Sequence, residues 1–277
     1  MTGSVRLLSG REAPQLRQLL LTDPVSYAMV LERTAIVGVG AALGAEVWGW
    51  FPDDELAAAL YLGANVVPIH ADDEAVAAFA SRARLTPRRC SSIVGPARSV
   101  LDFYEAVRPA WGDSRDVRPH QPMLAMNGQP RVAPDPRLRA AVMDDIDVLF
   151  PACVAMFTEE LGMSPLVPDG GAAYRRRVAT LIQQGRALVV IEDDQVLFKA
   201  EVGVVAQDVA QIQGVWVDPE HRGRHVSEPC MAAVVELTRL RHAPVVSLYV
   251  NDFNQPALAS YRKVGFEQVG EFATVLF

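Results

Sequence analysis

The spacing of apolar and polar positions divides the chain into short strands and amphipathic helices. Apolar residues three or four positions apart predict helices, as at Phe150, Val154 and Phe157, which share one helix face. Helices are predicted at 12–21, 23–33, 72–84, 98–107, 149–161, 173–184, 227–241 and 256–263. Apolar runs bounded by turn residues predict strands at 45–51, 91–94, 137–142, 187–192, 196–206, 211–217, 245–250 and 267–277, and a longer apolar run covers 56–70. Asp193-Asp194 reads as the turn of a hairpin.

The order of these elements predicts an α/β fold with a mixed sheet flanked by helices. The second half reads β–α–α–β–β–β–α–β–α–β, and the first half gives a shorter version of that order, which indicates a degenerate internal repeat. Trp111 to Pro136 contains five of the 19 prolines and is predicted to be extended and irregular, because proline fixes φ and restricts its neighbour. We therefore predict an N-terminal lobe at 1–125 and a second domain at 131–277.

Composition narrows the class of protein. Of 277 residues 50% are hydrophobic and 21% charged, which is typical of a globular protein, and no run of about 18 apolar residues or signal peptide is present. We therefore expect a cytoplasmic protein that makes no membrane contact. The net charge of −7 argues against nucleic-acid binding, while leaving room for a local basic site that holds an anionic cofactor. Cys90, Cys153 and Cys230 lack CxxC spacing, so neither a metal site nor a disulfide framework is expected.

Anion-binding chemistry concentrates in the segment QIQGVWVDPEHRGRHVSEPCM. The strand Val215-Trp216-Val217 runs into a short loop and then into a helix. The first N–H groups of a helix lack internal partners and carry partial positive charge, so this geometry suits a pyrophosphate. Arg222 and Arg224 add full positive charges.

The same segment resembles the acetyl-CoA motif of the GNAT superfamily, a strand followed by P-x-x-R-G-x-G-x-[AGS]. Matching positions are Val217, Pro219, Arg222, Gly223 and Ser227, whereas His225 stands where the family usually has glycine. The resemblance implies acetyl-CoA as co-substrate, bound by Val215, Trp216, Val217, Arg222, Gly223, Arg224, His225, Val226 and Ser227.

A second segment, VSLYVNDFNQPALASYRKVGF, resembles the C-terminal GNAT motif. Asn254, Ala257, Tyr261, Gly265 and Phe266 match that motif. The resemblance implies that Asn254 and Ala257 line the cofactor site and that Tyr261 protonates the departing thiolate. The alternative is that Tyr261 is simply a half-buried helix tyrosine. Together the two motifs cover residues 137–277 and predict a GNAT fold there, preceded by a degenerate GNAT-like α/β lobe.

The general base that would deprotonate the amine is less well marked. Glu201 lies in the apolar run FKAEVGVV, and it is equally compatible with a solvent-facing strand position. Glu159 and Glu160 are further candidates, of which at most one can serve because adjacent helix residues face different ways. In the first half, Asp72, Asp73 and Glu74 stand where the cofactor loop would be and would repel a pyrophosphate.

These observations predict an N-acetyltransferase that moves acetyl from acetyl-CoA to a primary amine by direct attack. Backbone N–H groups at Val215–Val217 would stabilise the oxyanion. The alternative is an acyl-CoA-binding regulatory module, or a pseudoenzyme with little turnover, because His225 crowds the loop. The acceptor remains open between a small metabolite, an antibiotic, a peptide N-terminus and lysine, and the protein is expected to be a monomer or a homodimer.

Overall fold

The computed structural model describes residues 3–40, 44–167 and 169–277. Its contacts divide the chain into two compact units, which are interleaved along the sequence. Unit 1 is Met1–Leu124, Tyr249–Asn254 and Gln268–Phe277, and unit 2 is Ala125–Leu248 and Gln255–Glu267. The C-terminal strand thus clusters with unit 1, whereas the sequence predicts linear domains at 1–125 and 131–277. The division into functional domains at 1–125 and 131–277 stays a prediction.

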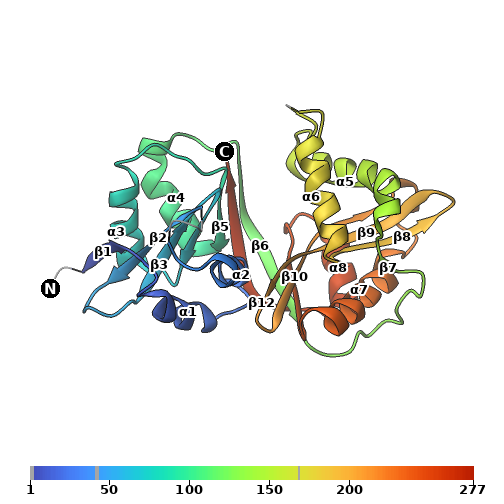
Figure 1. Cartoon of the computed structure of the whole chain (residues 1–277), viewed down its shortest axis with the longest axis horizontal. Coiled ribbons are helices and arrows are strands. Elements are labelled where there is room, and N and C mark those ends of the chain that lie inside the picture. Colours follow the sequence, from blue (N-terminus) through green and yellow to red (C-terminus); the bar gives the residue numbers. More distant parts are fainter. Residues whose placement is uncertain (1–2, 41–43, 168) are drawn as a thin grey trace. The chain divides into compact units, whose positions relative to one another are not determined.

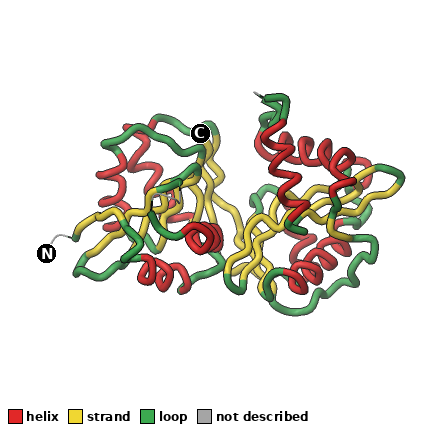
Figure 2. The backbone as a smooth tube through the Cα atoms, viewed as in Figure 1, coloured by secondary structure: helices red, strands yellow, loops and turns green. Residues whose placement is uncertain are grey.

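Unit 1 is an α/β unit whose strands lie in the order β1-β2-β3-β4-β5-β12-β6. Its elements are β1 (Ser4–Leu7), α1 (Ala13–Leu21), α2 (Ala28–Val37), β2 (Glu46–Phe51), β3 (Ala58–Leu62), β4 (Asn65–Ile69), α3 (Asp73–Ala83), β5 (Ser92–Pro96), α4 (Ala97–Trp111), β6 (Asp116–Met126) and β12 (Glu267–Leu276). The pair β4–β5 is parallel, while β1–β2, β2–β3, β3–β4 and β5–β12 are antiparallel. Figure 2 shows these strands as the yellow layer of the unit that holds both termini.

The core of unit 1 lies between this sheet and helices α3 and α4. Phe79 and Phe103 contribute two fully buried rings, and they belong to one cluster with Ile93 of β5. Ala273 and Val275 of β12 belong to the same cluster. The C-terminal strand is therefore part of this core, which explains why it clusters with residues so distant in sequence.

Unit 2 is a second mixed sheet, in the order β11-β10-β9-β8-β7. Its elements are β7 (Arg139–Ala140), a 3₁₀ turn η2 (Met143–Asp145), α5 (Ile146–Leu161), α6 (Ala172–Gln183), β8 (Ala187–Glu192), β9 (Gln195–Ala206), β10 (Val209–Val217), a 3₁₀ turn η3 (Pro219–His221), α7 (Ser227–Arg241), β11 (Val245–Tyr249) and α8 (Gln255–Val264). Only β10–β11 is parallel among the pairs β7–β8, β8–β9, β9–β10 and β10–β11. In Figure 1, α5 and α6 cover one face of this sheet, and α7 and α8 cover the other.

The internal repeat predicted from the sequence is confirmed by the topology. Each half runs through a strand, two helices, three strands, a helix, a parallel strand and a further helix. The strand–helix–strand unit β4–α3–β5 in the first half corresponds to β10–α7–β11 in the second, and both units pair their strands in parallel. The predicted α/β class with a mixed sheet is therefore confirmed in both halves.

The proline-rich segment Trp111 to Pro136 is not irregular throughout, as the sequence suggested. Residues 116–126 form the strand β6, which includes Pro119 and Pro122. A proline removes only its own N–H donor, and the carbonyl of Pro122 still accepts a hydrogen bond from Val250 N at 3.3 Å. Met123 and Leu124 are fully buried, so burial of apolar side chains outweighs the poor strand propensity of proline.

Candidate functional site

Strand β10 carries the irregularity on which the site is built. Gln213 pairs with Glu201 and Trp216 with Lys199 on β9, so Gly214 and Val215 together oppose one residue. This is a β-bulge, and Gly214 adopts a φ of +58° there. A Cβ at Gly214 would lie 3.0 Å from Met156 Cε and 3.2 Å from Glu201 Oε1. Glycine is therefore required by both conformation and space.

The other edge of β10 opens in the same region. Parallel pairing with β11 covers Val209–Gln211, whereas β10 continues to Val217. Within the described residues, the two strands thus pair at one end and diverge at the other. The backbone of residues 214–217 lies at this open edge, where the sequence predicts that Val215, Trp216 and Val217 contact the cofactor.

The loop after β10 leads directly into the N-terminus of α7. Gly223 has a φ of +75° and faces open space, with nothing within 4 Å of a Cβ built there. Helix α7 begins at Ser227, and Val226 at its N-cap makes no side-chain cap hydrogen bond. The first N–H groups of α7 are therefore not capped by that residue, as an anion site at a helix N-terminus requires.

His225 has a φ of +57°, in the left-handed region. Glycine adopts this conformation without strain, which gives a physical reason for the glycine that the related motif has at this position. Imidazole is accommodated because the side chain points outward and is 78% exposed. Histidine in place of glycine at position 225 therefore adds a side chain, but the backbone keeps the left-handed conformation that glycine favours.

Arg222 is already oriented by neighbouring groups. Its Nη2 lies 2.7 Å from Glu159 Oε2 at the end of α5, and its Nε donates to the Val217 carbonyl at 3.1 Å. Glu159 also accepts from Trp216 Nε1 at 3.3 Å. Trp216 and Arg222, two of the predicted cofactor residues, thus both donate to Glu159. With these bonds in place, the Glu159 carboxylate is less available as a general base. Arg224 is exposed.

Sequence reasoning missed Glu228, an acid in the first turn of α7 that is only 8% exposed. Its Oε1 lies 3.1 Å from His225 Nδ1 and accepts from Lys263 Nζ at 3.2 Å, while its Oε2 has no partner among the described residues. Burial alone would raise the pKa of Glu228, but the bonds from His225 and Lys263 outweigh it, and the pKa is lowered. The sequence signal that could have revealed Glu228 is its place directly after Ser227, the serine of the cofactor motif.

Tyr261 lies on α8 and is 7% exposed, with its ring edge-on to Phe266 at 6.0 Å. Burial raises the pKa of Tyr261 well above its ordinary value, and the nearby charge of Glu160 adds to the shift. The phenol therefore stays protonated, as a proton donor must. Ser227 Oγ and Ser260 Oγ lie 2.9 Å apart, so the start of α7 is joined to the turn of α8 that carries Tyr261.

The two other residues of the second motif lie at the start of α8. Ala257 belongs to the helix itself, while Asn254 precedes it and falls within unit 1. The backbone N–H of Asn254 donates to the Asn251 carbonyl at 3.0 Å.

Glu201 is buried, so the solvent-facing alternative is wrong. Its Oε1 accepts from the equally buried Lys199 Nζ at 2.6 Å, and its Oε2 lies 3.5 Å from Arg177 Nη2 and 3.4 Å from Gln213 Nε2. Burial raises the pKa of Glu201, but the charge and hydrogen bond of Lys199, together with Arg177 and Gln213, outweigh it and the pKa is lowered. A carboxylate held in this way is a weaker base than an unpaired one.

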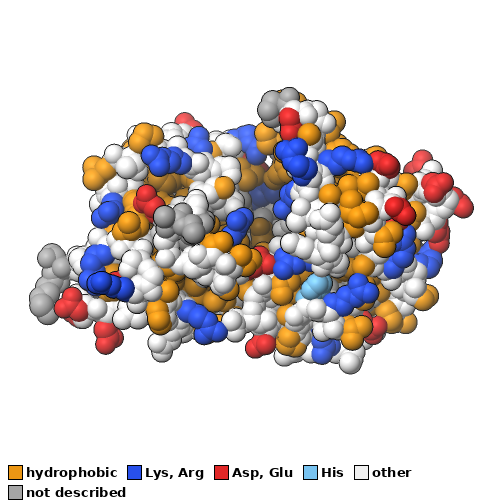
Figure 3. Space-filling view, viewed as in Figure 1, with side chains coloured by type: hydrophobic (Ala, Val, Ile, Leu, Met, Phe, Trp, Pro, Cys, Tyr) orange, Lys and Arg blue, Asp and Glu red, His pale blue; other side chains and the backbone are white. Residues whose placement is uncertain are grey.

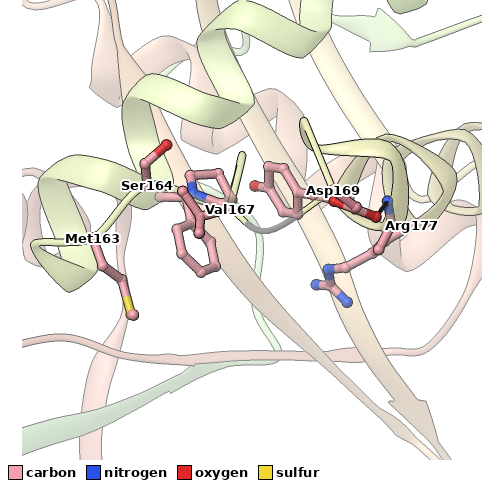
Figure 4. Close-up of a pocket in the computed structure, with 9 residues that line it drawn as sticks. Met163, Ser164, Val167, Asp169 and Arg177 are labelled. Carbon is pink, nitrogen blue, oxygen red and sulfur yellow. Dashed lines mark hydrogen bonds between the residues drawn. The ribbon is translucent and has the colours of Figure 1, made fainter.

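A hollow of about 610 Å³ opens beside this buried cluster, between α5 and α6. It is lined by Phe157, Met163, Ser164, Pro165, Val167, Asp169, Ala173, Tyr174 and Arg177. Figure 4 shows Met163 at one end of the lining and the Arg177 guanidinium at the other. Sequence reasoning placed no site here, since the loop residues carry no motif. Among the described residues, no cluster of potential metal ligands occurs, and no helix is long and apolar enough to cross a membrane.

Comparison with known families agrees with this geometry. Residues 157–266 match the family described as "Acetyltransferase (GNAT) family", and residues 45–149 match a domain of unknown function, DUF4081. Residues 157–266 are a GNAT domain. The match begins on α5 and ends at Phe266, so it includes the bulge, the loop, α7 and Tyr261. The predicted layout of a GNAT domain preceded by a second domain is thereby confirmed.

Relatives and solved structures extend the likeness. A putative ribosomal protein bS18-alanine N-acetyltransferase of Bacillus subtilis is 32% identical over 83 residues, which are 30% of this chain and 54% of that protein. The chain spans between about a quarter and about half of the curated relatives it matches. A GNAT-family acetyltransferase from Colwellia psychrerythraea aligns over 99% of both chains, with a TM-score of 0.59 and 11% identity. A tandem GNAT protein from the clavulanic acid biosynthesis pathway aligns over 98% of both chains, with a TM-score of 0.52 and 13% identity. The GNAT fold predicted for the second half is confirmed.

Proposed function

We propose that the protein is an N-acetyltransferase that moves acetyl from acetyl-CoA to a primary amine. The observation that carries the proposal is the open edge of β10 at the Gly214 bulge, followed directly by the N-terminus of α7. The open edge offers backbone N–H groups to the thioester carbonyl, and the helix N-terminus offers further donors to the pyrophosphate.

In the proposed reaction, the amine nitrogen attacks the thioester carbon. The oxyanion that forms accepts hydrogen bonds from N–H groups of residues 215–217. As it collapses, the C–S bond breaks and the CoA sulfur takes a proton from the Tyr261 hydroxyl, whose pKa is raised by burial. The amide nitrogen releases one proton, and Tyr261 regains one from solvent, so that acetyl amide and free CoA thiol are the products.

The loop and the helix supply the cofactor contacts in this proposal. Arg222, Gly223, Arg224, His225, Val226 and Ser227 surround the pyrophosphate, while Ala257 lines the pantetheine arm. Arg222 has to exchange Glu159 for phosphate, and its distance of 2.7 Å to that carboxylate makes this a real competition. Glu201 stays paired with Lys199, so the proton acceptor for the amine is a water or Glu159, which loses its cation when Arg222 turns to the phosphate.

One observation favours the alternative of an acyl-CoA-binding module with little turnover. The buried carboxylate of Glu228 lies in the first turn of α7, where it partly offsets the positive field that a pyrophosphate needs. The two functions separate in a simple pair of measurements. An enzyme releases free thiol from acetyl-CoA in the presence of an amine library, and acetyl-CoA raises its melting temperature. A binding module shows the thermal shift alone, and absence of both results would refute the proposal.

A further inference from the structure

The hollow beside α5 and α6 is lined mostly by apolar side chains. Its described lining also includes one positively charged group that keeps unused hydrogen-bond donors. Phe157 of α5 and Tyr174 of α6 lie with ring centroids 5.2 Å apart, and both line the hollow. Met163 and Val167 are 51% and 77% exposed, which is unusual for large apolar side chains that line one cavity. Figure 3 shows basic and hydrophobic side chains side by side over these helices.

Arg177 supplies the cation. Its side chain is half exposed, and among the described residues it donates only to Glu201, across a long 3.5 Å contact. Lys199 is the closer partner of that carboxylate at 2.6 Å. Guanidinium has five N–H donors in a planar fork that matches a carboxylate, so Arg177 retains donors for a ligand in the hollow.

The acidic group of the lining is already used. Asp169 Oδ1 accepts from Gly171 N at 3.1 Å, and Oδ2 accepts from Ala173 N at 2.8 Å, so its charge serves the N-terminus of α6. An acceptor with a second positive charge, such as a polyamine or lysine, therefore finds no unpaired carboxylate in this lining. An acceptor with a carboxylate and an apolar group can pair its carboxylate with Arg177 and pack its apolar group on the apolar residues of the lining.

The hollow is joined to the thioester site through one layer of side chains. Arg177 contacts Glu201, and Glu201 Oε1 lies 3.2 Å from the position of a Cβ at Gly214 in the β10 bulge. On the α5 side, Met156 precedes Phe157, and its Cε lies 3.0 Å from the position of the same Cβ. Glu201 and Met156 thus form the layer between Arg177 and the bulge.

We propose that the hollow binds the acceptor and that this acceptor is a free α-amino acid with an apolar side chain. Its carboxylate pairs with Arg177, its side chain packs on Phe157, Tyr174 and Met163, and its α-amine faces the bulge. The inference rests on the proposed acetyltransferase function. The product is an N-acetyl amino acid, formed by attack of the α-amine on the thioester with release of CoA thiol.

The test measures thiol release from acetyl-CoA with L-phenylalanine, L-phenylalaninamide and phenethylamine as acceptors. Loss of a charge-assisted hydrogen-bonded pair is expected to make kcat/KM for the amide and for phenethylamine at least about tenfold lower than for the acid. Arg177→Gln removes most of that preference, whereas Arg176→Gln, an exposed change on the same helix, leaves it in place. Arg177→Lys keeps the charge and loses the fork, so it gives an intermediate ratio.

Two outcomes would overturn the inference. Equal kcat/KM for phenylalanine and phenethylamine removes the role of the carboxylate, and an equal loss for every acceptor in Arg177→Gln assigns Arg177 to packing. Turnover with peptide N-termini or lysine but not with free amino acids rejects the acceptor class while the acetyltransferase function stands. The melting shift with acetyl-CoA, measured in each variant, separates these results from failure of the proposed function itself, in which no shift and no turnover occur.

Discussion

At the scale of single residues, Tyr261 combines burial with a protonated hydroxyl. Tyr261→Phe keeps the ring and its packing on Phe266, so acetyl-CoA affinity and melting temperature should stay close to wild type. Loss of a proton donor in the transition state is expected to lower kcat by about 10²–10⁴-fold. Because burial raises the pKa of Tyr261, no alkaline loss of activity from this group is expected below about pH 10. Stopped thiol assays across pH measure both effects.

Wild-type turnover in the Phe variant would make Tyr261 a packing residue. Simultaneous loss of acetyl-CoA affinity and melting temperature would instead assign it a structural role, with the proton coming from water.

His225 tests whether the loop tolerates a side chain at a left-handed position. His225→Gly removes a strained conformation that costs about 1 kcal/mol and also removes the contact with Glu228 at 3.1 Å. We expect acetyl-CoA binding to be kept or tightened up to a few-fold, because glycine adopts the left-handed backbone without strain. Isothermal titration calorimetry measures the affinity. A loss of more than tenfold would mean that the imidazole itself contacts the cofactor.

At the scale of elements, Asp135 anchors the segment before β7 to α7. Its carboxylate accepts from Arg137 Nη2 at 2.6 Å and Nε at 2.9 Å, and its backbone N–H donates to the Pro229 carbonyl at 2.9 Å. Hydrogen bonds from Arg137 hold the pKa of Asp135 below its ordinary value. The stabilisation is therefore present above the unfolded pKa of about 4 and is lost as pH falls through the folded value.

Asp135→Asn should lower the free energy of unfolding at pH 7 by about 1.5 kcal/mol, since Arg137 is half exposed. The difference from wild type should shrink as the pH falls below about 4, and urea unfolding at several pH values follows it. A difference that is constant from pH 7 to pH 3 would show that the ion pair contributes nothing. Asp144→Asn is the control, because Asp144 is exposed and forms no ion pair with any residue that the structure describes.

At the scale of the whole molecule, the two halves share a topology but differ at the helix that follows the fourth strand. In unit 1, Asp72 caps α3 by accepting from Ala75 N at 2.9 Å, and Asp73 and Glu74 follow in the first turn. In unit 2, α7 begins without a side-chain cap at Val226. Negative charge already occupies the first of these helix N-termini, which disfavours a pyrophosphate there.

We therefore predict one acetyl-CoA per chain, and Arg222→Glu should abolish the thermal shift entirely. The charge reversal places a second carboxylate beside Glu159, which is 2.7 Å from Arg222, so the unliganded melting temperature is recorded as well. Arg176→Glu is the matched charge reversal outside the loop. A stoichiometry of two, or a shift that survives Arg222→Glu, would contradict the assignment to the second half.

Local patterns were sufficient for most of the elements and for the cofactor loop. Helix α7 and strand β8 have the predicted bounds, because helix periodicity and strand alternation are set by neighbours in sequence. The apolar run 56–70 proved to be two strands, β3 and β4, since a continuous apolar stretch does not by itself reveal a turn. β1 and β6 were missed because their pairing partners are distant in sequence.

The sequence alone thus determined most of the order of elements, the repeat and the loop Arg222–Ser227, all of which depend on residues close together in the chain. Only the tertiary structure decided that Glu201 is paired with Lys199, that Glu159 holds Arg222, and that Arg177 lines a hollow beside Phe157. These groups meet across strands and helices, and their burial and charge partners depend on packing. The same dependence places β12, the last strand of the chain, in the core of unit 1, because Ala273 and Val275 are buried in one cluster with residues of α3 and α4.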